Sequence, residues 1–229
     1  MTPTLNRTDD DTHHGGRRDI RSTPTTVYDA LDDRSLLALM LRRSVTDPDA
    51  LAGDLLVHFG TLGAVAGADR GELVRVPGVG PAVLADLKLL PELAVRLARS
   101  EACRRPVITS WSALVAYVRV AMAHRLREQF RVLYLDRRNT LMCDELLAEG
   151  TVDHAPVYPR EVVRRALDLS ASAMILVHNH PSGDPEPSRA DIEMTRKIID
   201  AARLFGLQVH DHLVIGRQGT ASFKTLGLI

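Results

Sequence analysis

The sequence is poor in cysteine and in aromatic residues, and it has no excess of charge of either sign. Its two cysteines, Cys103 and Cys143, form no C-x-x-C pair, which excludes a disulfide scaffold and a cysteine-built zinc site and indicates a reducing compartment. Lysine plus arginine equals aspartate plus glutamate, at 29 each, so no global cationic field draws the chain to nucleic acid. Any DNA binding therefore has to be local.

Long apolar runs are also missing. No stretch approaches the roughly 20 apolar residues that span a bilayer, and the first residues lack the apolar core of a signal peptide. We therefore expect a soluble cytoplasmic protein. With 229 residues, 45% of them hydrophobic, the chain is long enough to bury a core in two small domains.

The N-terminal part divides into a polar tail and a helical domain. Residues 1–25 contain almost nothing to bury, which predicts a disordered tail. Residues 26–105 show helical periodicity, most clearly before Gly60, which suits a helix C-cap. We expect a small all-α domain of four or five short helices, in which Pro91 splits or kinks the last one.

A glycine-rich hairpin lies between two of the expected helices. The stretch Val76-Pro77-Gly78-Val79-Gly80-Pro81-Ala82 resembles a helix-hairpin-helix, in which backbone N–H groups face a DNA phosphate. The helix that follows lacks the early lysine that many such modules use, because its first cation is Lys88 and Asp86 lies nearer the hairpin. The pattern therefore predicts either a DNA contact or only a tight turn between packed helices.

A charged joint at residues 101–106 marks the expected start of a second domain, residues 106–229. Helical and strand patterns alternate after it, which predicts an α/β domain with a mixed sheet flanked by helices. The expected helices begin at Ser110, Pro159 and Ser188. The expected strands cover residues 130–136, 140–147, 172–178 and 207–216, with further short strands near 150–152 and 220–223.

One stretch carries residues suited to metal chemistry. His178 and His180 end an apolar strand pattern, and a proline-rich loop leads to Ser188 and Asp191 at a helix start. Side chains at i and i+2 of a strand share a face, so both histidines can reach one ion. Two nitrogen ligands and one oxygen ligand leave a fourth zinc position open for water, as in catalytic sites. Alternatively, Ser188-x-x-Asp191 is only a capping box, and the histidines are hydrogen-bonded core residues.

The string His178-x-His180, seven residues, Ser188, two residues, Asp191 resembles the signature of the JAMM metalloprotease domain, also called the MPN or JAB domain. The surrounding forms Leu176-Val177-His178-Asn179-His180-Pro181-Ser182-Gly183 and Val157-Tyr158-Pro159-Arg160-Glu161 look like those of the bacterial RadC family. With the glycine hairpin, this resemblance covers nearly the whole chain beyond the tail.

The resemblance implies a role for each motif residue. His178, His180 and Asp191 would bind Zn²⁺, and Ser188 would hydrogen-bond the oxyanion of the tetrahedral intermediate. The family also uses a glutamate from elsewhere in the domain as general base, placed where the first helix of the domain meets its first strand. Glu128 occupies that place, and Glu145 and Glu149 are the alternatives.

A second pair of histidines flanks Asp211. Because His210 and His212 stand at i and i+2 in an expected strand, we expect them to share one face, with Asp211 on the other. They could form another metal site. We favour instead that Asp211 or His212 orients a metal ligand by a hydrogen bond.

Three functions are compatible with these features. The first is a zinc-dependent peptidase or isopeptidase with a peptide or protein substrate. The second is a DNA-associated protein that binds through its helical domain, and the third is a non-catalytic MPN scaffold. A nucleobase deaminase is excluded, because the H-x-E and P-C-x-x-C motifs are missing.

Overall fold

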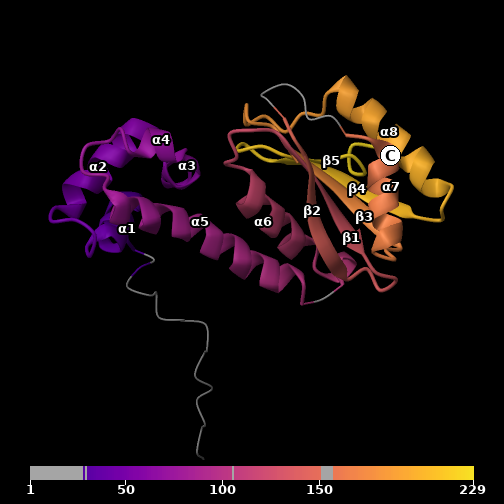
Figure 1. The fold of residues 1–229 in the computed structure, drawn as a ribbon, viewed down its shortest axis with the longest axis horizontal. Coiled ribbons are helices and arrows are strands. Elements are labelled where there is room, and N and C mark those ends of the chain that lie inside the picture. The colour runs from indigo at the N-terminus through magenta and orange to yellow at the C-terminus, as the bar shows by residue number, and fades with distance from the viewer. Residues whose placement is uncertain (1–27, 29, 105, 151–156) are drawn as a thin grey trace, which may run out of the picture.

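The computed structural model describes residue 28 and residues 30–104, 106–150 and 157–229. Within them, an N-terminal helical region is followed by a sheet region, and helix α5 leads from one to the other (Figure 1). The expected tail at residues 1–25 and most of the strand expected near 150–152 lie outside the described residues.

The helical region is built from short helices with ordinary caps. Its elements are α1 (Asp33–Leu41), α2 (Pro48–Phe59), α3 (Leu62–Gly67), α4 (Arg70–Leu73) and α5 (Pro81–Ala102). The carboxylate of Asp32 caps α1 by accepting the N–H of Ser35 at 2.8 Å. Gly60 ends α2 with a positive φ of 87° and donates its N–H to Leu56, which confirms the expected cap.

Helix α5 contributes to two hydrophobic cores. Near its start, Val83 and Leu87 pack among the buried leucines of α1 and α2. Near its end, Ala102 is buried in the core of the sheet region, and Val95 packs against that core. The helix runs through Pro91 without being split. Packing on both sides of Pro91 offsets the one backbone hydrogen bond that proline cannot donate.

The sheet is mixed, as predicted, and has five strands. In spatial order these are β2 (Leu141–Glu149), β1 (Gln129–Leu135), β3 (Ala173–Asn179), β4 (Gln208–Ile215) and β5 (Thr220–Ser222). Only β3 and β4 pair in parallel, and the other neighbours are antiparallel. Every residue of the central strand β3 is buried, which explains the continuous apolar run at residues 173–177.

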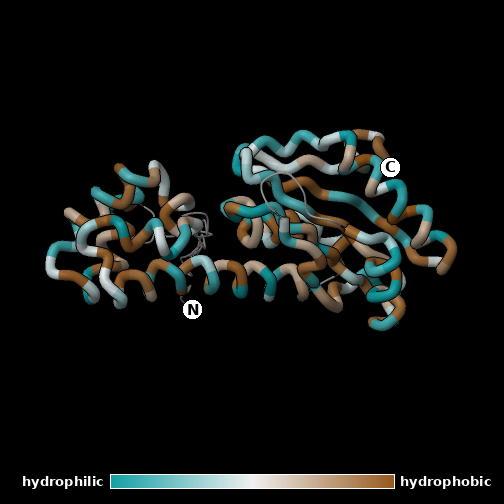
Figure 2. Tube along the Cα trace, turned by 45° about the horizontal axis from the view of Figure 1, so that its top comes forward, coloured by the Kyte–Doolittle hydropathy of each residue, from teal (hydrophilic) through white to brown (hydrophobic). Residues whose placement is uncertain are grey.

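Helices cover both faces of the sheet (Figure 1). The face with Ile175 and Val177 packs against α6 (Trp111–Met122) and the short helix η1 (Val107–Thr109). The opposite face, with Leu176, packs against α7 (Pro159–Asp168) and α8 (Arg189–Arg203). Hydrophobic and hydrophilic residues alternate along the helices, as expected when one side of each is buried (Figure 2). Because successive side chains of a strand point to opposite faces, His178 lies on the same face as Leu176 and emerges on the α8 side at the end of β3.

Candidate metal centre

The two histidines are held by the end of β3. His178 is its sixth residue, lies opposite Phe130 of β1 and is 1% exposed. His180 follows the strand directly, and its backbone N–H donates to the carbonyl of Ile215 at 2.9 Å. Both backbones are thus fixed by the sheet, so their side chains are presented from a rigid element rather than from a loose loop.

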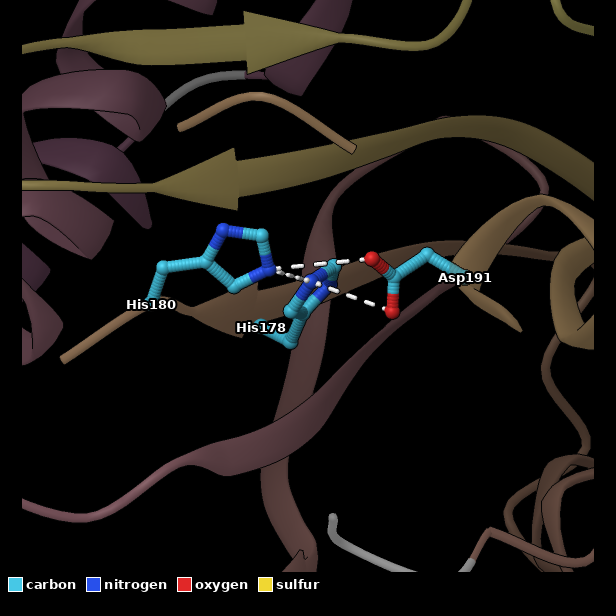
Figure 3. A group of neighbouring side chains, drawn as sticks. All are labelled: His178, His180 and Asp191. Carbon is cyan, nitrogen blue, oxygen red and sulfur yellow. Dashed lines mark hydrogen bonds and ion pairs between the residues drawn. The ribbon is translucent and has the colours of Figure 1, made fainter. Parts of the chain in front are cut away.

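Asp191 serves two purposes at the start of α8. Its carboxylate accepts the backbone N–H of Ser188 at 2.7 Å, and the Ser188 hydroxyl accepts the N–H of Asp191 at 3.2 Å, which is a complete capping box. The same carboxylate also faces His178 and His180 (Figure 3). The capping box is therefore present, and it holds the same carboxylate toward the two histidines.

Three side chains form a compact triangle. Nε2 of His178 lies 3.0 Å from Nε2 of His180 and 3.5 Å from Oδ1 of Asp191, and Nε2 of His180 lies 3.6 Å from Oδ2 of Asp191. These atoms all lie within 4.8 Å of one another, so the group could hold a metal ion. Ligands bound at about 2.0–2.1 Å to a tetrahedral zinc are separated by roughly 3.3 Å, close to the spacing found here.

A chain of hydrogen bonds orients the buried histidine. The hydroxyl of Thr195 on α8 donates to the carbonyl of Asp191 at 2.6 Å and lies 2.6 Å from Nδ1 of His212. Since that hydroxyl proton is already used, Thr195 accepts the Nδ1–H of His212. Nε2 of His212 then accepts the Nδ1–H of His178 at 2.8 Å. His178 consequently turns the lone pair of Nε2 toward the triangle, as a metal ligand must.

His180 is oriented in the same way by the loop that follows it. Its Nδ1 lies 2.8 Å from the carbonyl oxygen of Asp184 and so carries the proton, which leaves Nε2 for the triangle. The hydrogen bond with Asp191 raises the pKa of His180 above its ordinary value, and burial opposes this rise. Burial also raises the pKa of Asp191, but the hydrogen bonds that His178 and His180 donate to it when their imidazoles are protonated outweigh burial and hold that pKa well below the usual range.

Glu128 interacts electrostatically with one member of this triangle, His180. It stands in the segment between α6 and β1, immediately before Gln129, and not in a helical turn. The hydrogen bond with Asp191 is the largest cause of the raised pKa of His180, and the negative charge of Glu128 adds a smaller rise. Glu128 is thus placed within electrostatic reach of the candidate metal ligands.

The two alternative glutamates have other partners. Glu145 on β2 accepts a hydrogen bond from Nε of Arg165 at 2.5 Å, across the sheet edge. Glu149 lies 3.8 Å from Nη1 of Arg127 and 3.4 Å from the side-chain amide of Gln129. Neither contact involves the histidine triangle.

Asn179, the residue between the two histidines, ties the segment of Glu128 to β3. Its Oδ1 accepts the backbone N–H of Gln129 at 2.9 Å, and its Nδ2 donates to the carbonyl of Arg127 at 3.1 Å. These bonds hold the residues on either side of Glu128 at the end of the strand that carries the ligands. This role of Asn179 was not predicted from the sequence, although a polar residue inside a buried strand end was a signal for it.

The expectation that His210 and His212 share one face of β4 is wrong. The pairing of β4 with β3 shifts by one residue at this point, and such a bulge reverses the facing of the side chains before it. His212 therefore reaches His178, whereas His210 contacts Oδ1 of Asn139 at 2.6 Å and lines a cavity on the opposite face together with Asp211. The two histidines cannot form one site.

Asp211 holds the end of the sheet together. Its buried carboxylate accepts the hydroxyl of Ser222 at 2.6 Å and the backbone N–H groups of His212 at 2.7 Å and Lys224 at 3.0 Å. These contacts fasten β5 to β4. Of Asp211 and His212, it is His212 that contacts His178.

The glycine hairpin precedes α5 in the helical region. Gly78 has a φ of 91°, which favours glycine, and Gly80 is the N-cap of α5. The first cation of α5 points elsewhere, because Nζ of Lys88 donates to the carbonyls of Ala66 and Ala68 near the end of α3. In the described residues, Lys88 is thus already bound to the protein backbone.

Comparison with known families matches the part of the chain that carries the triangle. A family model described as RadC-like JAB domain matches residues 108–228, which is more than half of the chain. The match includes the whole sheet, α6 to α8 and all residues of the candidate metal centre. Among the described residues, no helix combines the length and the apolar character needed to cross a membrane.

Proposed function

Because the chain belongs to the RadC-like JAB domain family, we propose that it is a zinc-dependent hydrolase of the JAMM type that cleaves peptide or isopeptide bonds. The triangle of His178, His180 and Asp191 is the observation that carries this proposal. Its donor set of two imidazole nitrogens and one carboxylate suits zinc and leaves a coordination position open. Nδ1 of His178 is hydrogen-bonded to His212, and Nδ1 of His180 is hydrogen-bonded to the carbonyl of Asp184, so Nε2 of each histidine is left for a metal.

The metal would supply a water of lowered pKa and polarise the scissile carbonyl. Glu128 is the proposed general base, which takes a proton from the attacking water and passes it to the leaving amine. The hydroxyl of Ser188 accepts the N–H of Asp191 and keeps its own proton, so it can donate to the oxyanion. Ser188 is exposed, as contact with a substrate requires.

Zinc analysis of the purified full chain tests the metal assignment. We expect one zinc per chain, and we expect His178→Ala and Asp191→Ala each to lose it. His210→Ala is the matched control, because His210 lies on the other face of the sheet and should leave zinc unchanged. Stoichiometric zinc in both ligand variants would refute the site.

Hydrolysis tests the proposed reaction. The zinc-loaded chain is incubated with a library of quenched fluorescent peptides, linear and lysine-branched, and Glu128→Gln serves as the matched inactive variant. Cleavage by the native chain alone supports the hydrolase. Zinc binding without cleavage of any library member would favour the non-catalytic scaffold instead.

A further inference from the structure

A cavity of about 550 Å³ lies between the helical region and the sheet region, away from the metal ligands. Residues of α3, α5 and α6, the turn after α6 and Arg217 line it. We propose that this cavity binds a small phosphorylated molecule of about nucleotide size. Its volume falls in the range of roughly 300–1,000 Å³ that is typical of small-molecule sites.

The cavity is strongly cationic although the chain as a whole is neutral. Lys88, Arg119, Arg125 and Arg217 line it, and Glu92 is its only acidic residue among those described. Since the sequence holds 29 basic and 29 acidic residues, this excess is a local feature. Such a concentration of one sign in a concave site attracts ligands of the opposite charge.

Its cations are not neutralised by carboxylates. In the described ranges, none of the four forms an ion pair, and Glu92 is engaged by Arg96 at 2.6 Å. Their recorded contacts are with neutral backbone carbonyls: Nε of Arg125 donates to Ala121 at 3.0 Å, and Nη2 of Arg217 donates to Ser182 at 3.1 Å. The guanidinium groups therefore keep donors available for an anion.

The cations that line the cavity repel one another, although burial has the larger effect on the pKa values of Lys88 and His124. Burial has the largest effect on Lys88 and lowers its pKa. Among the nearby charges, Asp69 raises this pKa and Arg125 lowers it. Burial and then the charge of Arg217 lower the pKa of His124, which also lines the cavity. A bound anion relieves this repulsion, because it places negative charge among the cations.

The lining also indicates what the anion is attached to. Apolar side chains, among them Leu62, Pro91, Val95 and Val120, make up much of the wall. Several cations suit a multiply charged phosphate better than a single carboxylate, and arginine binds phosphate oxygens in pairs. The apolar wall suits a flat or apolar body on the same molecule. A phosphorylated compound with such a body, like a nucleoside diphosphate, uses both features.

Calorimetric titration of the full chain with adenosine diphosphate, inorganic pyrophosphate and adenosine tests the proposal. We expect saturable binding of adenosine diphosphate at one site, weaker binding of pyrophosphate and none of adenosine. Arg119→Gln and Arg125→Gln should each weaken the binding of adenosine diphosphate about tenfold, because each removes a charge-assisted hydrogen bond. Arg137→Gln, in the exposed turn between β1 and β2, is the matched control and should bind like the native chain.

Two further titrations distinguish binding in this cavity from binding at the metal centre or on a nucleic-acid surface. Asp191→Ala should bind adenosine diphosphate like the native chain, since the proposed site does not use the metal centre. Binding that survives both arginine changes but disappears in Asp191→Ala would overturn the proposal and place the ligand at the metal. A single-stranded oligonucleotide that binds when neither adenosine diphosphate nor pyrophosphate does would also overturn it, in favour of a nucleic-acid surface.

Discussion

Nδ1 of His178 lies 2.8 Å from Nε2 of His212, a residue 34 positions later in the chain. Through this contact β4 determines which nitrogen of the ligand on β3 faces Asp191. Thr195 completes the arrangement from α8, where Asp191 also originates. The geometry of the candidate metal centre therefore depends on how two strands and one helix pack, and not on the histidine motif alone.

We expect His212→Ala to weaken zinc binding about 10- to 100-fold, the usual effect of losing a partner that orients a ligand. The physical reason is that His178 would no longer be held with Nδ1 as its protonated nitrogen. Chelator competition at neutral pH measures the affinity. His210→Ala is the control, and equal affinities of the native chain and His212→Ala would show that His178 orients itself.

The sequence predicted most of the helices and strands and the three side chains that form the triangle, because strand and helix periodicity and the histidine and capping patterns are local. The sequence did not predict on which faces of β4 His210 and His212 lie. Their facing depends on a one-residue shift between β3 and β4, which is a property of the pairing of two strands. The same holds for Asn179, whose partners Arg127 and Gln129 lie some 50 residues away.

The pH dependence of zinc binding should follow His180. Its pKa is raised above the ordinary value, about 6.5, chiefly by the hydrogen bond with Asp191. Below the raised pKa a metal has to displace a proton from His180, so zinc affinity is complete above this pKa and falls as the pH is lowered through it. Titrations between about pH 8 and pH 6, with proton release measured in two buffers, test this expectation.

In the metal-free protein, the contribution of His180 to the unfolding free energy should change with pH in the direction opposite to zinc affinity. The pair of protonated His180 and Asp191 stabilises the fold fully below about pH 6.5 and is lost as the pH rises through the raised pKa. The difference in unfolding free energy between the native chain and His180→Ala isolates this contribution. A difference that grows with rising pH would contradict the assignment.

Gly216→Ala should displace the loop between His180 and Ser188. A Cβ at Gly216 would lie 2.2 Å from the carbonyl oxygen of Gly183 and 3.0 Å from the nitrogen of Pro185, both backbone atoms. We expect a loss of about 1–3 kcal/mol in unfolding free energy, measured by denaturant titration, and weaker zinc binding. Gly219→Ala is the control, since its Cβ would meet only Cγ of Pro185 at an ordinary 3.7 Å.

Gly67→Ala should destabilise the packing of α3 against the turn after α6. The added Cβ would lie 2.8 Å from both Cβ and the carbonyl oxygen of His124. Alanine in a helix is otherwise favoured over glycine by up to about 1 kcal/mol, so a lowered unfolding free energy identifies the clash. Gly71→Ala, which meets no atom within 4 Å, should be neutral or slightly stabilising by the same thermal-unfolding measurement.

Glu128→Gln should separate chemistry from metal binding. The change keeps the size of the side chain and removes the carboxylate that serves as the proposed base. We therefore expect kcat for peptide or isopeptide hydrolysis to fall about 10²- to 10⁴-fold. Zinc content should remain unchanged, because the triangle of ligands does not include Glu128.

The other two glutamates supply the matched controls for this prediction. Glu145→Gln removes the partner of Arg165, and Glu149→Gln removes the contact with Arg127, so either change alters a charge on β2 without reaching the triangle. We expect both variants to retain most of the native kcat. If Glu149→Gln lost activity while Glu128→Gln kept it, the base would have to be placed at the end of β2 rather than at the start of β1.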